Sequence, residues 1–404
     1  MKTLSAPFVP DVDRPHAKVS RSKAHRLLRQ GGALVAAMAL CLPLLRFLFD
    51  PGEHERAALR THEARVVTDA ASESRSVDSI RRVNPEWDLM RRMYLALALT
   101  DAAMAHPEDR DKYVGAVDKI ARDLVAATAS DDPYVFLLPY AKASPWQATG
   151  RSLFVDGEVA VVLEARLLLS PSRDLEAPLA KHISAIEHAM NESPTASGES
   201  YPGEAWTFCN TTALLALRMH DVRVHTDHEA LARKWIAFAR ARLVDQKTGL
   251  LGSRYRYATG YVDEGPEGSS IFMSAHNLKV WDEAFARDQY ERARALLTFD
   301  VLGFGLAREW PSGSRPDIDS GPIVPLLGAS PASSGMALLG ATTFGDADLA
   351  KRLRRSLNLA AIPRTPRDGE LSFAAAGPMG NAVVLLALGD GALIRAIQSR
   401  SEVL

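Results

Sequence analysis

The sequence predicts an all-α protein, a closed toroid of six helical hairpins or (α/α)6 barrel, preceded by an N-terminal transmembrane helix. Three observations lead to this prediction. Apolar residues recur with helical spacing almost throughout the chain after residue 83. The helical segments alternate between one that is apolar nearly all round and one that is amphipathic. Within the first 49 residues, a basic stretch is followed by an apolar run.

Composition excludes several classes of protein. The chain has 404 residues, of which 47% are hydrophobic and 24% charged, and its formal net charge is −1. These values are typical of a globular chain with a sizeable core and provide no basic tail, so we expect no nucleic-acid partner. The two cysteines, Cys41 and Cys209, allow neither a disulfide framework nor a cysteine-based zinc site.

The first 83 residues divide into three predicted segments. Residues 1–30 contain prolines and many charges, and we expect them to form a disordered basic N-terminus. Residues 31–49 are predicted to be a transmembrane signal-anchor. Their unbroken apolar part is short for a bilayer, unless Arg46 extends its charge to the interface. Residues 50–83 are predicted to be a polar, partly helical linker.

The charges around the apolar run predict its orientation. Basic residues precede it and acidic residues follow it, so the positive-inside rule places the N-terminus in the cytoplasm. We therefore expect a single-pass protein of the cytoplasmic membrane whose barrel lies on the periplasmic or extracellular side. A cleaved signal peptide and a cytosolic amphipathic helix are the alternatives. No A-x-A pattern follows the apolar run, which favours the uncleaved anchor.

Residues 84–404 are predicted to form the barrel. Turn-forming residues divide this region into about six pairs of helices. The predicted pairs are residues 84–105 with 110–128, 151–169 with 174–190, 204–220 with 227–244, 269–285 with 288–301, 333–344 with 346–359, and two short pieces within 378–398. Strand signals are confined to short pieces such as residues 250–262, which we expect to form a hairpin on a loop.

The two members of a pair differ in their expected burial. Residues 157–169 and 211–217 are apolar nearly all round, as in helices buried on every side, whereas residues 227–242 have one apolar and one charged face. An inner ring of buried helices inside an outer ring of amphipathic ones is an (α/α) barrel. A superhelical solenoid of the same hairpins is the alternative. Long polar loops on one side of the pairs favour the closed barrel.

Acidic and aromatic residues gather in the loops that precede the inner helices. The densest stretch is residues 201–210, YPGEAWTFCN, where we expect a helix to begin near Glu204. Because the N-terminal ends of all inner helices face the same way in a barrel, these loops are expected to converge on one mouth. The residues concerned are Asp156, Glu158, Tyr201, Glu204, Trp206, Glu267, Glu309, Trp310, Asp317 and Asp319.

A mouth lined by carboxylates and aromatic rings suits two classes of reaction. A protonated carboxyl can donate to a leaving oxygen while an ionised one removes a proton from water or carbon. Glycoside hydrolysis uses such a pair, and so does cofactor-free dehydration or isomerisation. The spacing in sequence does not supply the distance between the carboxyls, so both classes stay open. A catalytically silent receptor is the third hypothesis, because a single loop carboxylate is more often a helix cap or a solvated charge.

Two further residues are candidates with a structural alternative. Cys209 lies at the start of a helix, where the helix dipole lowers the pKa of a thiol, although a core cysteine needs no such explanation. His276 falls within the fourth inner helix, where it is either a substrate-contacting acid or base or a core histidine. No cation-binding loop motif surrounds Asp317 and Asp319, and no phosphate loop, dinucleotide fingerprint or G-x-S-x-G motif is present, so we expect neither metal nor cofactor.

Residues 153–292 resemble the catalytic domain of the linalool dehydratase/isomerase family. The resemblance is carried by the 202–210 block with its terminal Cys209-Asn210, by the helix around Trp235 that leads into DQKTGL at 245–250, and by the block 282–290. It implies an (α/α)6 barrel that is cofactor-free and located outside the cytoplasmic membrane. It also implies a homo-oligomer with its site near a subunit contact, and acid/base chemistry that adds or removes water on an allylic terpene alcohol.

The chain departs from the family at most of the positions that the resemblance assigns to catalysis. Cys209 matches one active-site cysteine, but Ser200 stands at the place of the second and Glu158 at the place of a catalytic histidine. The active-site tyrosine aligns near Ser269, and the family's N-terminal catalytic aspartate has no match. A different acid/base set in the same mouth is therefore predicted.

The leading prediction is a membrane-anchored, cofactor-free lyase or isomerase that acts on a small or lipid-like organic substrate; a glycoside hydrolase-like enzyme is second. Glu204 and Glu158 are predicted as acid and base, with Asp319 and Glu267 next and Cys209 as a further candidate. The predicted substrate contacts are Trp206, Tyr201, Asp156, Glu309, Trp310, Asp317 and His276.

Overall fold

The computed structural model describes residues 25–26, 28–38, 52–130, 132, 134–311, 320–365 and 369–401. The chain divides into two compact units, Met1–Phe49 and Asp50–Leu404. In the first unit, residues 28–38 are helical and exposed. The predicted disordered and membrane segments, residues 1–30 and 31–49, lie largely outside the described residues.

The predicted transmembrane helix is not supported. Among the described residues, no single helix is both long enough and apolar enough to cross a membrane. One pair of helices near the C-terminus, Gly377–Ala387 and Ala392–Ser399, passes the same test together but is bent by 52°. The first of these helices is part of the ring described next.

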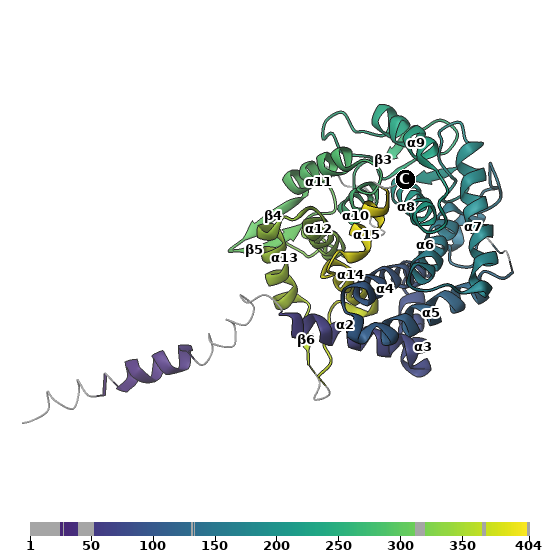
Figure 1. The fold of residues 1–404 in the computed structure, drawn as a ribbon. Helices are drawn as coiled ribbons and strands as arrows, with labels where there is room; N and C mark the ends of the chain where they lie inside the picture. The colour runs from purple at the N-terminus through teal and green to yellow at the C-terminus, as the bar shows by residue number, and fades with distance from the viewer. Residues whose placement is uncertain are drawn as a thin grey trace, which may run out of the picture. The chain divides into compact units, whose positions relative to one another are not determined.

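Six helices of the second unit form a closed ring (Figure 1). They are α4 (Glu86–Ala105), α6 (Leu153–Leu169), α8 (Thr207–Val224), α10 (Gly268–Leu278), α12 (Pro331–Phe344) and α14 (Gly377–Ala387). Each packs against the next, and α14 packs against α4, which closes the ring. The prediction of a mostly helical chain is confirmed, and closure decides between the barrel and the open solenoid.

Amphipathic helices surround the ring. They are α5 (Arg110–Ala127), α7 (Arg173–Asn191), α9 (Glu229–Arg242), α11 (Glu283–Leu297) and α13 (Ala347–Ala360). Residues predicted as a linker form two further helices, α2 (Glu53–Thr68) and α3 (Ala70–Arg81). Helix α2 packs against α5 and α14 because its apolar side chains, such as Leu59 and Val67, are buried there. The last helix, α15 (Ala392–Ser401), contacts α4 and α8.

Short strands occupy the connections between outer and inner helices. The strands β1 (Glu204–Trp206), β2 (Arg254–Arg256) and β3 (Val262–Glu264) form one antiparallel sheet. The strands β4 (Thr298–Val301) and β5 (Phe304–Ala307) form a hairpin, as do β6 (Pro363–Arg364) and β7 (Ser372–Phe373). The expected helix start near Glu204 is therefore wrong by three residues. Gly203 turns the chain at φ +81°, and the next three residues pair with β2 before α8 begins at Thr207.

All inner helices run the same way, so the ring has two distinct ends. We call the end where they begin the mouth and the end where they finish the base. At the mouth, the first amide of α6 bonds to Glu199 O (2.7 Å), that of α8 to Ser253 O (2.9 Å), and that of α10 to Glu309 O (2.6 Å). Each acceptor lies in the loop that leads to the next inner helix, so these bonds align successive N-termini.

Candidate functional site

A buried carboxyl without a hydrogen-bond partner marks the mouth. Glu158 lies in the second turn of α6, is 0% exposed, and neither of its carboxyl oxygens has a partner. Burial raises the pKa of Glu158 well above its usual range, and the negative charge of Glu86 raises it further. An isolated buried carboxylate is too costly to retain its charge, so Glu158 holds a proton at neutral pH.

Glu86 provides the second carboxyl at this end. It is the first residue of α4, and its Oε1 accepts a hydrogen bond from the Leu138 amide at 3.0 Å. The Tyr201 hydroxyl is also hydrogen-bonded to Glu86, and the pKa of Tyr201 is raised well above its usual range by burial and then by the Glu86 charge. Two donors directed at one carboxyl favour its ionised form.

One hydroxyl and one thiol, those of Tyr94 and Cys209, interact electrostatically with the Glu158 carboxyl. Tyr94, two turns into α4, is fully buried, and its hydroxyl has no hydrogen-bond partner. Burial raises the pKa of Tyr94 well above its usual range, with further contributions from Glu158 and Cys209. Burial also raises the pKa of the Cys209 thiol far above its usual range, and this outweighs the hydrogen bond from Ser200. The thiolate expected from the helix dipole is therefore not favoured, and Cys209 is a neutral thiol.

Aromatic rings form a wall beside these groups. The Tyr201 ring stacks on Tyr140 and Phe154, with ring centroids 5.3 Å and 6.4 Å apart. The Trp206 ring meets the Tyr201 ring edge-on at 6.2 Å. The structure therefore places Tyr201 and Trp206 at the mouth, next to Glu86 and Phe154.

Glu204 lies apart from this group, on the small sheet. It is half-buried in β1, where its carboxylate accepts from the Trp206 indole N–H at 3.3 Å and lies 3.5 Å from Arg254. Arg254 also pairs with Glu264 at 2.9 Å. The strand that replaces the predicted helix start directs Glu204 toward β2, so its carboxylate is paired with a cation instead of being buried beside Glu158.

Asp156 points away from the ring interior. It is two residues from Glu158 on α6, so the two side chains lie about 200° apart around the helix. Its carboxylate pairs with Arg151 (Nε at 2.9 Å) and with His182 Nδ1 on α7 at 2.7 Å. Asp156 therefore links α6 to the outer layer and is not a substrate contact in this arrangement.

Two other predicted acids act as structural groups at the mouth. The Glu309 carboxylate accepts from the Ser269 amide at 3.1 Å, from the Ser330 and Ser333 hydroxyls at 2.7 Å each, and from the Ser269 hydroxyl. It thus joins the N-termini of α10 and α12. Glu267 is buried and is the N-cap residue of α10. Trp310 beside them is half-buried.

The remaining predicted residues do not join the group. His276 lies in the last turn of α10, at the base, where Nδ1 bonds to the Thr343 hydroxyl at 2.7 Å. Burial and the nearby charge of Lys279 lower the pKa of His276 to about 4. His276 is therefore a core histidine, the second of the two interpretations that the sequence allowed. Asp317 and Asp319 lie outside the described residues.

Sequence reasoning missed Glu86 and Tyr94. Glu86 follows Asn84-Pro85 at the start of the first inner helix, the same station that singled out the acids of the later helices. A search of that station in all six pairs would have found it. Tyr94 had no such signal, because it lies within the apolar pattern of α4 and resembles any core tyrosine.

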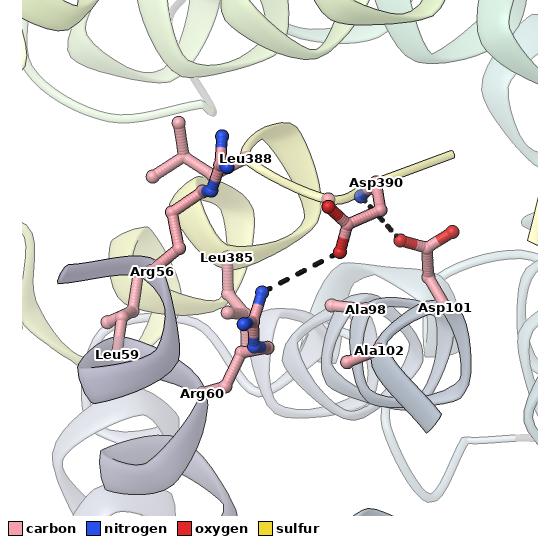
Figure 2. A pocket seen from close by; sticks show the side chains of 10 residues that line it. Arg56, Leu59, Arg60, Ala98, Asp101, Ala102, Leu385, Leu388 and Asp390 are labelled. Carbon is pink, nitrogen blue, oxygen red and sulfur yellow. Dashed lines mark hydrogen bonds and ion pairs between the residues drawn. The ribbon is translucent and has the colours of Figure 1, made fainter. Parts of the chain in front are cut away.

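The base is closed by paired charges (Figure 2). Arg60 lies 3.6 Å from the Asp390 carboxylate, and the Asp390 amide donates to Asp101 at 2.7 Å beside a cavity of about 10 Å³. Among the described residues, Glu53, His106 and Asp390 bring one ligand atom each within 4.8 Å of one another. Arg60 pairs with both of these carboxylates and already supplies a counter-charge, so this group carries no argument for a metal.

Several solved structures are similar to this chain. An α-mannanase of glycoside hydrolase family 76 from Bacteroides thetaiotaomicron is 10% identical, with 78% of this chain and 86% of that chain covered and a TM-score of 0.46. An α-1,6-mannanase from Salegentibacter sp. HEL1_6 is 10% identical (75% and 89% covered, TM-score 0.47). A family 105 glycoside hydrolase from C. acetobutylicum ATCC 824 is 12% identical (84% and 99% covered, TM-score 0.46). At these TM-scores, the likenesses support no conclusion about function.

A family model matches a large part of the chain. The model is that of linalool dehydratase/isomerase, and it covers residues 179–376. The matched region includes α8, with Cys209, and the starts of the next two inner helices, α10 and α12. The match confirms, at the level of the family, the resemblance of this chain to the linalool dehydratase/isomerases.

Proposed function

We propose that the mouth is the active site of a cofactor-free lyase or isomerase that adds or removes water on a small, largely apolar alcohol. The observation that carries the proposal is the fully buried Glu158 carboxyl without a hydrogen-bond partner. A group of this kind can donate a proton at neutral pH, and Glu86, with two donors directed at it, can accept one.

In the dehydration direction, the Glu158 carboxyl donates its proton to the substrate hydroxyl. The carbon–oxygen bond breaks and water leaves with the bonding electrons. Glu86 then takes a proton from the neighbouring carbon, and the electrons of that C–H bond form the double bond. The released water passes a proton from Glu86 back to Glu158, so the enzyme is regenerated and the net reaction is alcohol to alkene and water. Hydration is the reverse.

Two further observations support this assignment. The aromatic rings of Tyr201, Phe154 and Trp206 beside the carboxyl can stabilise positive charge that develops when the carbon–oxygen bond breaks. Three of the positions that the family resemblance assigned to catalysis, Glu158, Ser200 and Cys209, lie close together at the mouth, since the Ser200 hydroxyl is hydrogen-bonded to the Cys209 thiol and the Glu158 charge affects its pKa.

The test compares two buried glutamates. Glu158→Gln keeps the side-chain shape but cannot donate a carboxyl proton. Glu63→Gln is the matched control, since Glu63 on α2 is also buried, with its pKa raised by burial, but pairs with Asn381. Both variants are assayed with a panel of allylic terpene alcohols, and the products and their deuterium content from D₂O are measured.

We expect Glu158→Gln to lower kcat/KM by about 10²–10⁴-fold while circular dichroism is unchanged, because general acid catalysis contributes about that much. Glu63→Gln should stay within about threefold of the parent, because Glu63 lies on α2, outside the ring of inner helices. Equal activities of Glu158→Gln and the parent would overturn the assignment. The panel includes oligosaccharides, because paired carboxylates also cleave glycosidic bonds, and release of reducing sugar instead of alkene would favour the glycosidase.

We also propose that the barrel lies outside the cytoplasmic membrane and forms a homo-oligomer. The charge asymmetry around residues 31–45 supports the first statement, and the family resemblance supports both. Protease added to intact spheroplasts should digest the barrel only if it faces outward, and light scattering of the purified chain gives the oligomeric state.

A further inference from the structure

Exposed apolar side chains gather at one end of the barrel. Among the described residues of the second unit, the exposed large apolar side chains lie in connections that lead into an inner helix, or in the last turn of an outer helix, with the exception of Val224. These residues are Val83, Tyr140, Tyr261, Leu296, Val301, Leu302, Val324, Leu326, Leu327, Leu359 and Ile362. By connectivity, both kinds of position lie toward the mouth, and the hairpin with Leu302 at its turn also packs along the outer helix α13. The base has Val224, at the end of α8.

Three of these residues have an unfavourable backbone conformation; Leu302 and Leu326 lie in turns, and Ile362 lies between α13 and β6. Leu302 is 94% exposed at φ 55°, Leu326 is 107% exposed at φ 67°, and Ile362 is 57% exposed at φ 54°. Left-handed φ values are rare for large side chains and costly for a β-branched one. Backbone conformational preference does not explain leucine or isoleucine at these three positions, and neither does burial of apolar area within this chain. Their side chains therefore point to a contact outside the chain.

Basic side chains accompany the exposed apolar side chains. Arg82 precedes Val83, Lys142 follows Tyr140 by two residues, and Arg364 follows Ile362 by two; all three cations are exposed. The Arg256 guanidinium lies 5.3 Å from the centroid of the Tyr261 ring. Two of the nearby acids are paired within the chain, Asp263 with Arg256 at 3.3 Å and Glu264 with Arg254 at 2.9 Å.

We propose that the mouth is a docking surface for an anionic lipid bilayer. The apolar residues stand on separate connections with cations between them, whereas the core of a protein–protein interface is a continuous patch depleted of charge. The exposed leucine and isoleucine side chains can enter the acyl region of a bilayer, and tyrosine side chains are typical of the headgroup boundary. Arginine and lysine attract anionic headgroups. Docking would open the mouth toward the phase in which an apolar substrate concentrates. The docking surface itself is independent of the proposed reaction.

The test reads the orientation of the full-length chain on vesicles of phosphatidylcholine and phosphatidylglycerol that contain brominated phosphatidylcholine. Single tryptophans are introduced at the mouth, L302W and I362W, and at the base, V224W. Quenching is measured as the difference from the parent, which has six tryptophans of its own. Each reporter is specific to its position, so the difference between positions 302 or 362 and position 224 gives the orientation of the barrel on the vesicle.

We expect quenching at positions 302 and 362 and none at 224. Equal quenching at the two ends, or quenching at 224 alone, would overturn the proposal. In a second measurement, the double variant L302E/L326E should lose at least tenfold in the additional quenching of a reporter at 362. A blue shift of the 302 reporter that depends on protein concentration and needs no vesicles would instead identify a second copy of the chain as the occupant.

Discussion

Helix α6 carries two fully buried glutamates, one near each end of the ring, and their surroundings are opposite. At the base, Glu164 accepts from His220 Nδ1 at 2.6 Å and from Arg223 Nε at 2.7 Å. At the mouth, six residues earlier, Glu158 has no hydrogen-bond partner at all. Both side chains are 0% exposed, so the difference lies in the neighbours and not in the depth of burial.

This difference indicates which end of the ring is built for stability. A buried ion pair with good geometry offsets the cost of desolvating two charges, whereas an unpaired carboxyl only adds cost. The base repeats the paired pattern, with His228 between Asp221 (2.5 Å) and Glu187 (2.6 Å). The mouth combines the unpaired Glu158 and Tyr94 with exposed apolar side chains. Unpaired buried polar groups and exposed apolar side chains both lower stability, and their concentration at one end is typical of a functional surface.

The largest expected effect comes from removing the cation that pairs with Glu164 at the base, which makes this carboxylate more like the unpaired Glu158 at the mouth. Arg223→Ala removes the permanent cation beside the buried Glu164 carboxylate, leaves it with His220 alone, and should lower the free energy of unfolding by about 3–5 kcal/mol. The control is Arg233→Ala, which removes an exposed pair with Glu229 on α9 and should cost about 0.5 kcal/mol or less. Urea denaturation measures both. Similar losses for the two variants would show that the buried ion pair contributes no more to the free energy of unfolding than the exposed one.

Glu158→Gln should act in the opposite direction on stability. The folded-state pKa of Glu158 is raised above 4.5, so its contribution is fully present below pH 4.5 and is lost as the pH rises through the folded pKa. The variant does not titrate and lacks this loss, so at pH 7 its free energy of unfolding should exceed that of the parent by about 1.4 kcal/mol for each pH unit over which the loss has accumulated. Below pH 4.5 the two should converge. A variant less stable than the parent at pH 7 would show that the carboxyl has an essential partner.

The smallest expected effect concerns His228 at the base. Burial opposes its charged form, but the bonds to Asp221 and Glu187 prevail and raise the pKa of His228 to about 9. A raised histidine pKa gives stability that is fully present below pH 6.5 and is lost as the pH rises through about 9. The parent should therefore lose a few degrees of Tm over that range. His228→Gln should flatten the slope, and an unchanged slope would assign it to another group.

Much of the fold could be predicted because it depends on local periodicity. The alternation of all-apolar and amphipathic segments predicted the order of inner and outer helices, and the ring closes in that order. The errors came from contacts distant in sequence. Residues 204–206 became a strand because they pair with residues 254–256. Residues 53–68 became a packed helix because their apolar face meets α5 and α14, and residues 70–81 pack against α4 and α14.

The site was predicted in outline and corrected in detail. The sequence singled out Glu158 among the acids near the inner-helix starts, and the structure buries its carboxyl in the second turn of α6 without a hydrogen-bond partner. Asp156 and Glu158 could not be distinguished by residue type, yet helical geometry sends one to an Arg–His pair on the outside and the other into the ring. Glu204 was ranked with Glu158, but Arg254, fifty residues later, pairs with it.

The sequence by itself determined the succession of helices and the end of the ring at which acidic and aromatic residues collect, because hydrophobic period and turn residues act within a few residues of the chain. Only the tertiary structure decided which carboxyls there are paired and which one keeps a proton. The pKa of a buried group depends on desolvation and on charges brought close by folding, such as Glu86 of α4 beside Glu158 of α6, and such neighbours are separated by many residues in the chain.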